Sequence, residues 1–87
     1  MLTSKERMHI IHEKLQKAFS PTHLEIIDDS DQHKGHVGAS GGAGHYTVMI
    51  QADSFQNKSR VDAHREIYAV LGDLIPREVH ALRVKIN

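Results

Sequence analysis

Cysteine is absent from this chain of 87 residues. Without cysteine, the chain forms no disulfide, has no thiol nucleophile and supplies no thiolate ligand to a metal. A metal cluster that is bound through thiolates would therefore need the sulfur atoms of a partner molecule.

An excess of either charge and a long apolar run are also absent. The chain has 11 basic and 11 acidic residues, so no overall field attracts nucleic acid or an anionic membrane, although a local basic patch is compatible with this balance. No apolar run approaches the ~20 residues that a membrane span needs, and residues 1–7 lack the apolar core of a signal peptide. We expect a soluble, cytoplasmic protein with one domain over residues 1–87.

Histidine, in contrast, is abundant, with 8 in the chain. His33, His36 and His45 lie in or beside a glycine-rich segment that follows Asp28, and His80 begins the last apolar strand pattern. Imidazole binds borderline metals and titrates near physiological pH, so this grouping indicates a metal or proton site. Each histidine taken singly is better explained as a solvated or packed side chain, and it is the grouping that favours a site. His-x2-His is too generic to define a closed zinc site.

Hydrophobic periodicity predicts two helices. The first follows a capping box of Thr3 and Glu6 and stops before Pro21, and the second begins at Ser59 in a region that ends at Pro76. Their apolar stripes are Met8, Ile11, Leu15, Ala18 and Phe19 in the first, and Ala63, Ile67, Val70, Leu71 and Leu74 in the second.

Alternation of apolar and polar residues predicts three strands, over residues 23–28, 46–51 and 82–86. The first two should pair antiparallel, and the second and third should be parallel because a right-handed crossover through a helix joins them. The αββαβ order predicts a two-layer α+β fold in which both helices cover one face of a three-stranded mixed sheet. The expected core is Ile26, Val48, Ile50, Ile67, Val70, Leu71, Leu82 and Val84, with Tyr46 and Phe55 at its edges.

A basic cluster at the start of the second predicted helix is a candidate nucleic-acid contact. Its members are Lys58, Arg60, His64 and Arg65, and a helix N-terminus adds favourable charge for a phosphate. A solvated basic helix face is the commoner explanation. The glycine-rich segment lacks the ending of a P-loop, and no nucleophile and base form a recognisable pair, so we do not expect an enzyme.

Four segments in this order closely resemble the BolA family. They are Leu24–Ser30 followed by His33, Gly44–Tyr46, Ser54–Ser59 with His64-Arg65 after it, and Val79–Leu82. The resemblance covers nearly the whole chain and implies a fold like the type II KH domain.

The resemblance also implies a partnership with monothiol glutaredoxins, in which the two proteins share a [2Fe-2S] cluster. In such a complex, glutaredoxin and glutathione supply the thiolates. The BolA-like protein supplies a histidine at the start of its last strand and a second ligand, histidine or cysteine, from its long loop. On this chain those ligands are His80 and His33, with His36 and His45 as alternatives for the loop ligand.

A second hypothesis from the same resemblance is a nucleic-acid-binding transcriptional regulator of stress response and cell morphology, with DNA as a candidate partner. KH domains clamp the nucleic-acid backbone with a GXXG loop, whereas Phe55-Gln56-Asn57-Lys58 stands at the corresponding turn. We therefore rank cluster sharing first. A small interaction module without metal is the third interpretation, and a weak homodimer is compatible with all three.

Overall fold

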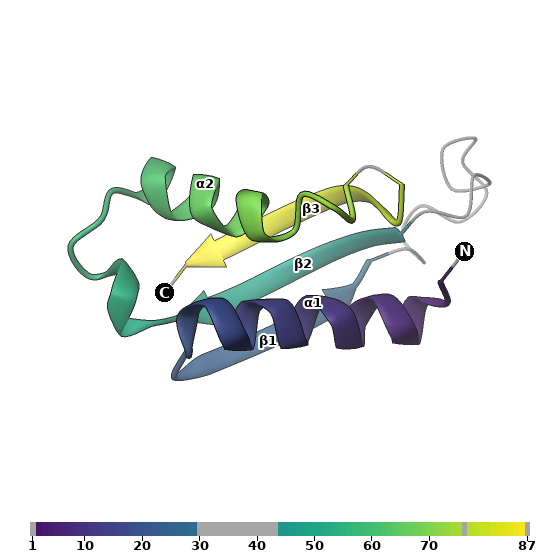
Figure 1. Ribbon diagram of the computed structural model, residues 1–87, viewed down its shortest axis with the longest axis horizontal. Coiled ribbons are helices and arrows are strands. Elements are labelled where there is room, and N and C mark those ends of the chain that lie inside the picture. Colours follow the sequence, from purple (N-terminus) through teal and green to yellow (C-terminus); the bar gives the residue numbers. More distant parts are fainter. Residues whose placement is uncertain (1, 30–43, 76, 87) are drawn as a thin grey trace.

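The computed structural model describes residues 2–29, 44–75 and 77–86. Two helices lie against one face of a sheet of three strands, and a short 3-10 helix leads from the second strand into the second helix (Figure 1). In chain order the elements are α1 (Ser4–Phe19), β1 (His23–Asp28), β2 (Gly44–Gln51), η3 (Asp53–Phe55), α2 (Arg60–Val70) and β3 (Val79–Ile86).

Side-chain caps begin both α-helices at the residues that the sequence indicates. The Thr3 hydroxyl accepts a hydrogen bond from the Glu6 N–H at 3.1 Å, and the Glu6 carboxylate accepts one from the Thr3 N–H at 2.9 Å. The Ser59 hydroxyl accepts a hydrogen bond from the Asp62 N–H at 3.1 Å. These bonds satisfy backbone donors that a helix leaves unpaired in its first turn, which confirms both predicted starts.

The second helix is shorter than its apolar stripe. It ends at Val70, and the Gly72 N–H then donates to the carbonyl of Ala69, which tightens the chain into turns. Leu71 and Leu74 lie in these turns yet are buried. The helical spacing of Leu71 and Leu74 therefore predicted their burial correctly, but the predicted helix was longer than the observed one.

The sheet has the order β1-β2-β3, with β1 antiparallel and β3 parallel to the central strand β2. In the register, Val48 lies opposite both Ile26 and Val84, so these three side chains share a face. The predicted αββαβ order and mixed three-stranded sheet are confirmed. β2 and β3 begin at Gly44 and Val79, earlier than the alternation alone indicated.

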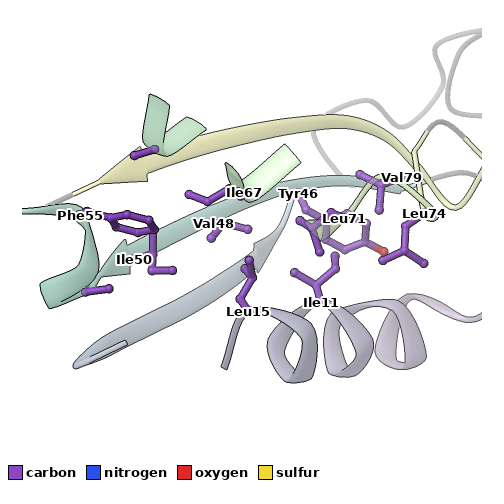
Figure 2. Close-up of a cluster of buried hydrophobic side chains, with 12 residues drawn as sticks. Ile11, Leu15, Tyr46, Val48, Ile50, Phe55, Ile67, Leu71, Leu74 and Val79 are labelled. Atoms are coloured by element: carbon purple, nitrogen blue, oxygen red, sulfur yellow. The ribbon is translucent and has the colours of Figure 1, made fainter. Parts of the chain in front are cut away.

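The core lies between the helices and this face of the sheet (Figure 2). Tyr46 and Phe55, expected at its edges, are only 1% and 7% exposed. Tyr46 belongs to the central strand, whose helix-facing side chains both helices cover. Ala18 is exposed, which corrects its assignment to the apolar stripe. Four predicted core residues are only partly buried and pack around the buried cluster: Ile26, Val70, Leu82 and Val84.

Candidate functional site

Two of the predicted metal ligands, His45 and His80, lie side by side. Their ring centroids are 5.3 Å apart and the ring planes are inclined by 57°. His45 precedes the buried Tyr46 on β2, and successive side chains of a strand point to opposite faces, so His45 lies on the face that the helices leave open. His80 is exposed, whereas His45 is half-buried and its Nε2 atom is shielded from solvent, so solvent reaches the pair from the side of His80.

An irregularity in the pairing of β2 with β3 places His80 there. Gly44 pairs with Val79 and His45 pairs with Ala81, so His80 is an additional residue on β3. An extra residue of this kind shifts the alternation of side chains by one position. Val79 is buried, and His80 and Ala81 are both exposed. After them the predicted alternation resumes: every second residue from Leu82 is partly buried, and the residues between are exposed.

Backbone hydrogen bonds fix the chain at His45 and just before His80. The Gly44 N–H donates to the Glu78 carbonyl at 3.0 Å, and the Asp29 N–H donates to the His45 carbonyl at 2.7 Å. A Cβ atom at residue 44 would lie 2.2 Å from Cε2 of Tyr46, so the close approach of this ring requires glycine. The backbones of Gly44, one residue before His45, and Glu78, two residues before His80, are thus fixed to one another.

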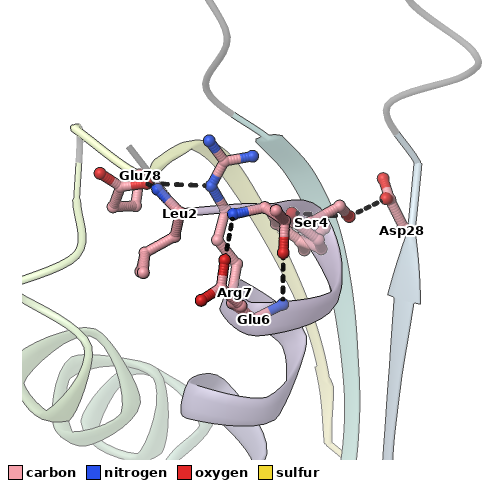
Figure 3. Close-up of polar contacts among 8 residues, drawn as sticks. Leu2, Ser4, Glu6, Arg7, Asp28 and Glu78 are labelled. Carbon is pink, nitrogen blue, oxygen red and sulfur yellow. Dashed lines mark hydrogen bonds and ion pairs between the residues drawn. The ribbon is translucent and has the colours of Figure 1, made fainter.

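A charged network anchors the same end of the sheet to α1 (Figure 3). The Arg7 Nε atom donates to the Glu78 carboxylate at 3.1 Å, and the Leu2 N–H donates to the same oxygen at 3.1 Å. Nearby, the Ser4 hydroxyl donates to the Asp28 carboxylate and lies 3.1 Å from the Tyr46 hydroxyl. These contacts connect the start of α1 to β1, to β2 and to the turn that precedes β3.

Arg7 and Glu78 stabilise one another's charge. Burial disfavours the charged form of Arg7, which is 5% exposed, but hydrogen bonds with Tyr46 and Glu78 outweigh this effect and raise the pKa of the guanidinium. Desolvation likewise opposes ionisation of Glu78, and the hydrogen bonds from Arg7 and Leu2 outweigh it and lower the pKa of that carboxyl. Both groups are therefore ionised at neutral pH.

The histidine pair opens into a cleft of about 370 Å³. Its lining is Asp29, His45, Tyr46, His80, Ala81, Leu82 and Arg83. Within the described residues, no group of three or more His, Cys, Asp or Glu side chains could hold a metal ion. A four-coordinate centre at this pair would need ligands from elsewhere. The other two candidates, His33 and His36, lie outside the described residues.

The predicted basic cluster is divided by the structure. Lys58 forms an ion pair with Glu66, whereas Arg60, His64 and Arg65 line a second groove of about 600 Å³ between α2 and β3. The rest of its lining is Val61, Tyr68, Val84, Lys85 and Ile86. The two grooves share no lining residue, so the histidine pair and the basic cluster form separate sites.

Sequence reasoning missed Arg7 and Glu78. A signal for Arg7 was present, because it precedes Ile11 and Leu15 at the four-residue spacing of the buried helix face. No local signal marks Glu78, whose partner is 71 positions away in the chain. None of the helices in the described ranges has the length and apolarity that a membrane crossing requires.

Comparison with known proteins identifies relatives with this sequence and fold. The model of the BolA-like protein family matches residues 15–87. SufE-like protein 1, chloroplastic/mitochondrial, of Arabidopsis thaliana is 43% identical over 79 residues, which are 85% of this chain and 21% of that protein. The DNA-binding transcriptional regulator BolA of Escherichia coli (strain K12) is 36% identical over 72 residues, 83% of this chain and 66% of that protein.

Two solved structures have the same arrangement of helices and strands. The BolA domain of SufE1 from Arabidopsis thaliana superposes with a TM-score of 0.80 at 40% identity and covers 100% of this chain and 94% of its own. BolA1 from the same plant also has a TM-score of 0.80, at 34% identity, with coverage of 93% and 89%. The chain therefore corresponds to nearly all of each solved structure but to only part of the two longer relatives.

Proposed function

Because this chain belongs to the BolA family, we propose that it is a non-enzymatic cytoplasmic adaptor that shares a [2Fe-2S] cluster with a monothiol glutaredoxin. The adaptor serves iron–sulfur trafficking or iron sensing, and the cluster is cargo that passes through it. His80 and His45 are the two ligands that the chain contributes.

The observation that carries this proposal is the distance between the two imidazole rings. With metal–nitrogen bonds of about 2 Å and tetrahedral angles, two imidazoles on one metal ion place their ring centres about 5 Å apart. The His45 and His80 centroids are 5.3 Å apart, and the His80 ring is exposed. The spacing therefore fits two histidine ligands on one iron, and on this ground we take His45 as the second ligand, with His33 and His36 as the alternatives.

The composition of the chain supports a shared cluster rather than a resident one. Four ligands bind the two irons of a [2Fe-2S] cluster, and thiolates commonly fill these positions. This chain has no cysteine, so thiolates from glutaredoxin and glutathione complete the set on the second iron. Replacing two thiolates on one iron by neutral imidazoles makes a cluster less negative and raises its reduction potential.

The framework around the pair supplies the positioning. Glu78 precedes β3 and is held by Arg7 through its side chain and by Gly44 through its carbonyl. Rigid support of this kind keeps ligand geometry within the narrow limits that a metal site requires. The chain thus holds an exposed and a half-buried imidazole beside one another, where a second protein can approach His80.

Anaerobic reconstitution tests the proposal. The chain is mixed with a monothiol glutaredoxin, glutathione, iron and sulfide, and the visible absorption and circular dichroism are compared with those of glutaredoxin alone. We expect a changed spectrum that the His80→Ala and His45→Ala variants lose. His12→Ala is the matched control, because His12 is an exposed histidine on α1 outside the cleft.

Different results contradict different parts of the proposal. A spectrum identical to that of glutaredoxin alone contradicts cluster sharing. A changed spectrum that His45→Ala retains, and that His33→Ala or His36→Ala abolishes, preserves cluster sharing and overturns the choice of His45. Retention of the spectrum in His80→Ala overturns the assignment of the ligand on β3.

The alternative, a DNA-binding regulator, has weaker support from the described residues. Relatives from Escherichia coli, Haemophilus influenzae and Vibrio cholerae carry that name, and three members of the predicted basic cluster line one groove. However, Lys58 is paired with Glu66, and a KH-type GXXG sequence is absent from the turn before α2. We therefore keep this function second. Binding to DNA that weakens steeply with salt, and that fails in Arg60→Ala and Arg65→Ala variants, would bring it to first place.

A further inference from the structure

The groove between α2 and β3 is a second surface, distinct from the histidine cleft. It lies beside the C-terminal half of β3, whereas the histidine pair lies at the other end of the strand. Figure 1 shows α2 alongside the edge of the sheet that β3 forms. The volume of about 600 Å³ is in the range of sites that bind a small molecule or a short peptide segment.

The backbone of β3 offers unpaired hydrogen-bonding groups to this groove. β3 is an edge strand whose neighbour is β2. The Tyr68 hydroxyl donates to the Leu82 carbonyl at 2.7 Å, so this carbonyl points toward α2 and away from β2. Alternate residues of a strand direct their N–H and C=O groups to the same side. The corresponding groups of Val84 and Ile86 therefore point into the groove, as on a strand edge that can accept another strand.

The floor of the groove is apolar and open to solvent. Val61 is 59% exposed and Tyr68 is 40% exposed, which places them among the few large apolar side chains that the described residues leave exposed. They are seven positions apart on α2 and thus share a face of the helix. An apolar side chain laid across them would remove this surface from water.

The rim of the groove is cationic. Arg60, Arg65 and Lys85 line it, and no ion pair joins any of them to another residue of ranges 2–29, 44–75 and 77–86. Lys58, in contrast, is neutralised by Glu66 outside this lining. A ligand with carboxylates on either side of an apolar group would complement the rim and the floor together.

We propose that this groove binds an extended acidic segment of a partner protein, which adds as a strand along β3. Its backbone pairs with the edge groups of Val84 and Ile86, and an apolar side chain covers Val61 and Tyr68. Flanking carboxylates meet the cationic rim. An extended peptide uses the strand edge, the apolar floor and the charge, whereas a nucleic acid would use chiefly the charge. This inference stands independently of the proposed cluster sharing.

A synthetic peptide tests the strand addition. The probe is a capped, fluorescently labelled octapeptide in which glutamate alternates with valine, and binding is followed by fluorescence anisotropy and by amide chemical shifts of the isotope-labelled protein. We expect shifts centred on Val61, Tyr68, Val84 and Ile86. In an added strand, every second amide faces β3 and the others face solvent. N-methylation of the amides that face β3 should abolish binding, and N-methylation of the amides that face solvent should be tolerated. Equal effects of the two sets contradict strand addition.

Charge reversal tests the rim. The Arg60→Glu/Arg65→Glu variant should bind the peptide about tenfold more weakly. Lys5→Glu/Lys17→Glu is the matched control, since both lysines are exposed on α1 and the change in net charge is the same. An equal loss in the control variant overturns the proposed site, as does the absence of groove shifts at millimolar peptide.

A single-stranded oligothymidine is the competing probe. If it displaces the peptide from the groove and binds more tightly, the occupant is a nucleic acid and the peptide proposal is overturned. Cluster reconstitution with the Arg60→Glu/Arg65→Glu variant separates the two proposals, because neither arginine lines the histidine cleft. The mixed-cluster spectrum should be unchanged in this variant.

Discussion

The two ends of β3 are built from different chemistry. At the start of the strand, Val79 is fully buried, the Glu78 carbonyl accepts from Gly44, and the Glu78 carboxylate is bonded to Arg7. Toward its end, Val84 and Ile86 are half-buried beside α2, and their edge faces an open groove. One end is cross-linked by polar contacts, and the other is left as an unpaired edge.

This difference matches the demands of the two proposed functions. Metal ligands need fixed positions, because small displacements weaken coordination. A strand edge that accepts a partner segment needs free backbone groups and exposed apolar surface, which a closed network would remove. Substitutions at the histidine end should therefore cost more stability than substitutions at the groove end.

The largest effect is expected at Gly44. A Gly44→Ala side chain would collide with the Tyr46 ring, which is only 1% exposed and has no room to move away. Overpacking of this kind costs about 1–3 kcal/mol, measured as a change in the free energy of unfolding by urea. Gly72→Ala is the control, because its Cβ atom would meet its nearest neighbour, the Ala69 carbonyl oxygen, at 3.4 Å. An equal loss of unfolding free energy in Gly72→Ala and Gly44→Ala would show that the histidine end of β3 is not specially sensitive to added volume.

Breaking the ion pair that anchors the histidine end should have the next largest effect. Arg7→Met leaves the Glu78 carboxylate without its guanidinium partner, and we expect the melting temperature to fall by about 8–16 °C. Lys14→Met removes the ion pair of Lys14 with Asp73, which is 65% exposed, so its melting temperature should change much less. Equal shifts for the two variants would show that the Arg7 contact has no special structural role.

The cap of α1 should contribute less stability than the Arg7 ion pair, and part of its contribution should depend on pH. Thr3→Ala should cost about 1 kcal/mol at neutral pH. Hydrogen bonds from the Thr3 backbone and side chain lower the pKa of Glu6 from its ordinary value of 4.5. Because the folded-state pKa is the lower one, the carboxylate stabilises the fold above pH 4.5, and this contribution is lost as the pH falls through the lowered pKa. The difference in urea midpoint between the wild type and Glu6→Gln should therefore be present at pH 7 and shrink in acid.

The smallest effect is expected at the groove end. Tyr68→Phe removes the hydrogen bond to the Leu82 carbonyl, but the ring is 40% exposed and water can replace the hydroxyl. We expect a loss of about 0.5 kcal/mol in the free energy of unfolding. The variant also exposes one more acceptor on the strand edge, so peptide affinity should be retained or increase. A cost as large as that of Gly44→Ala would show that the groove end is not the looser one.

Most of the fold was predictable because its signals are local. Thr3 with Glu6 and Ser59 with Asp62 marked both helix starts, and the alternation around Val48 and Val84 marked the two parallel strands. The errors also have local causes. Helical spacing continued through Leu71 and Leu74 after the helix had ended, because buried turns can keep the same apolar period.

The candidate site was predictable only in its residue types. The abundance of histidine indicated a metal or proton site, and the lack of cysteine meant that any thiolate ligand would come from a partner. Cluster sharing and the role of His80 came from the family resemblance. The contact between His45 and His80 joins residues 45 and 80 through an extra residue in one strand, which no periodicity reveals. The predictions that involve His33 and His36 concern residues outside the described ranges and remain predictions.

The sequence by itself determined the helices and strands of this protein, because they follow from spacings of a few residues. It also determined the balanced charge and the presence of many imidazoles without any thiol, because these follow from composition. Tertiary structure alone decided which residues meet. It paired His45 with His80, buried Arg7 against Glu78, and separated Lys58 from the groove that Arg60 and Arg65 line. The physical reason is that strand register and helix packing set these distances, and both depend on contacts between segments that lie far apart along the chain.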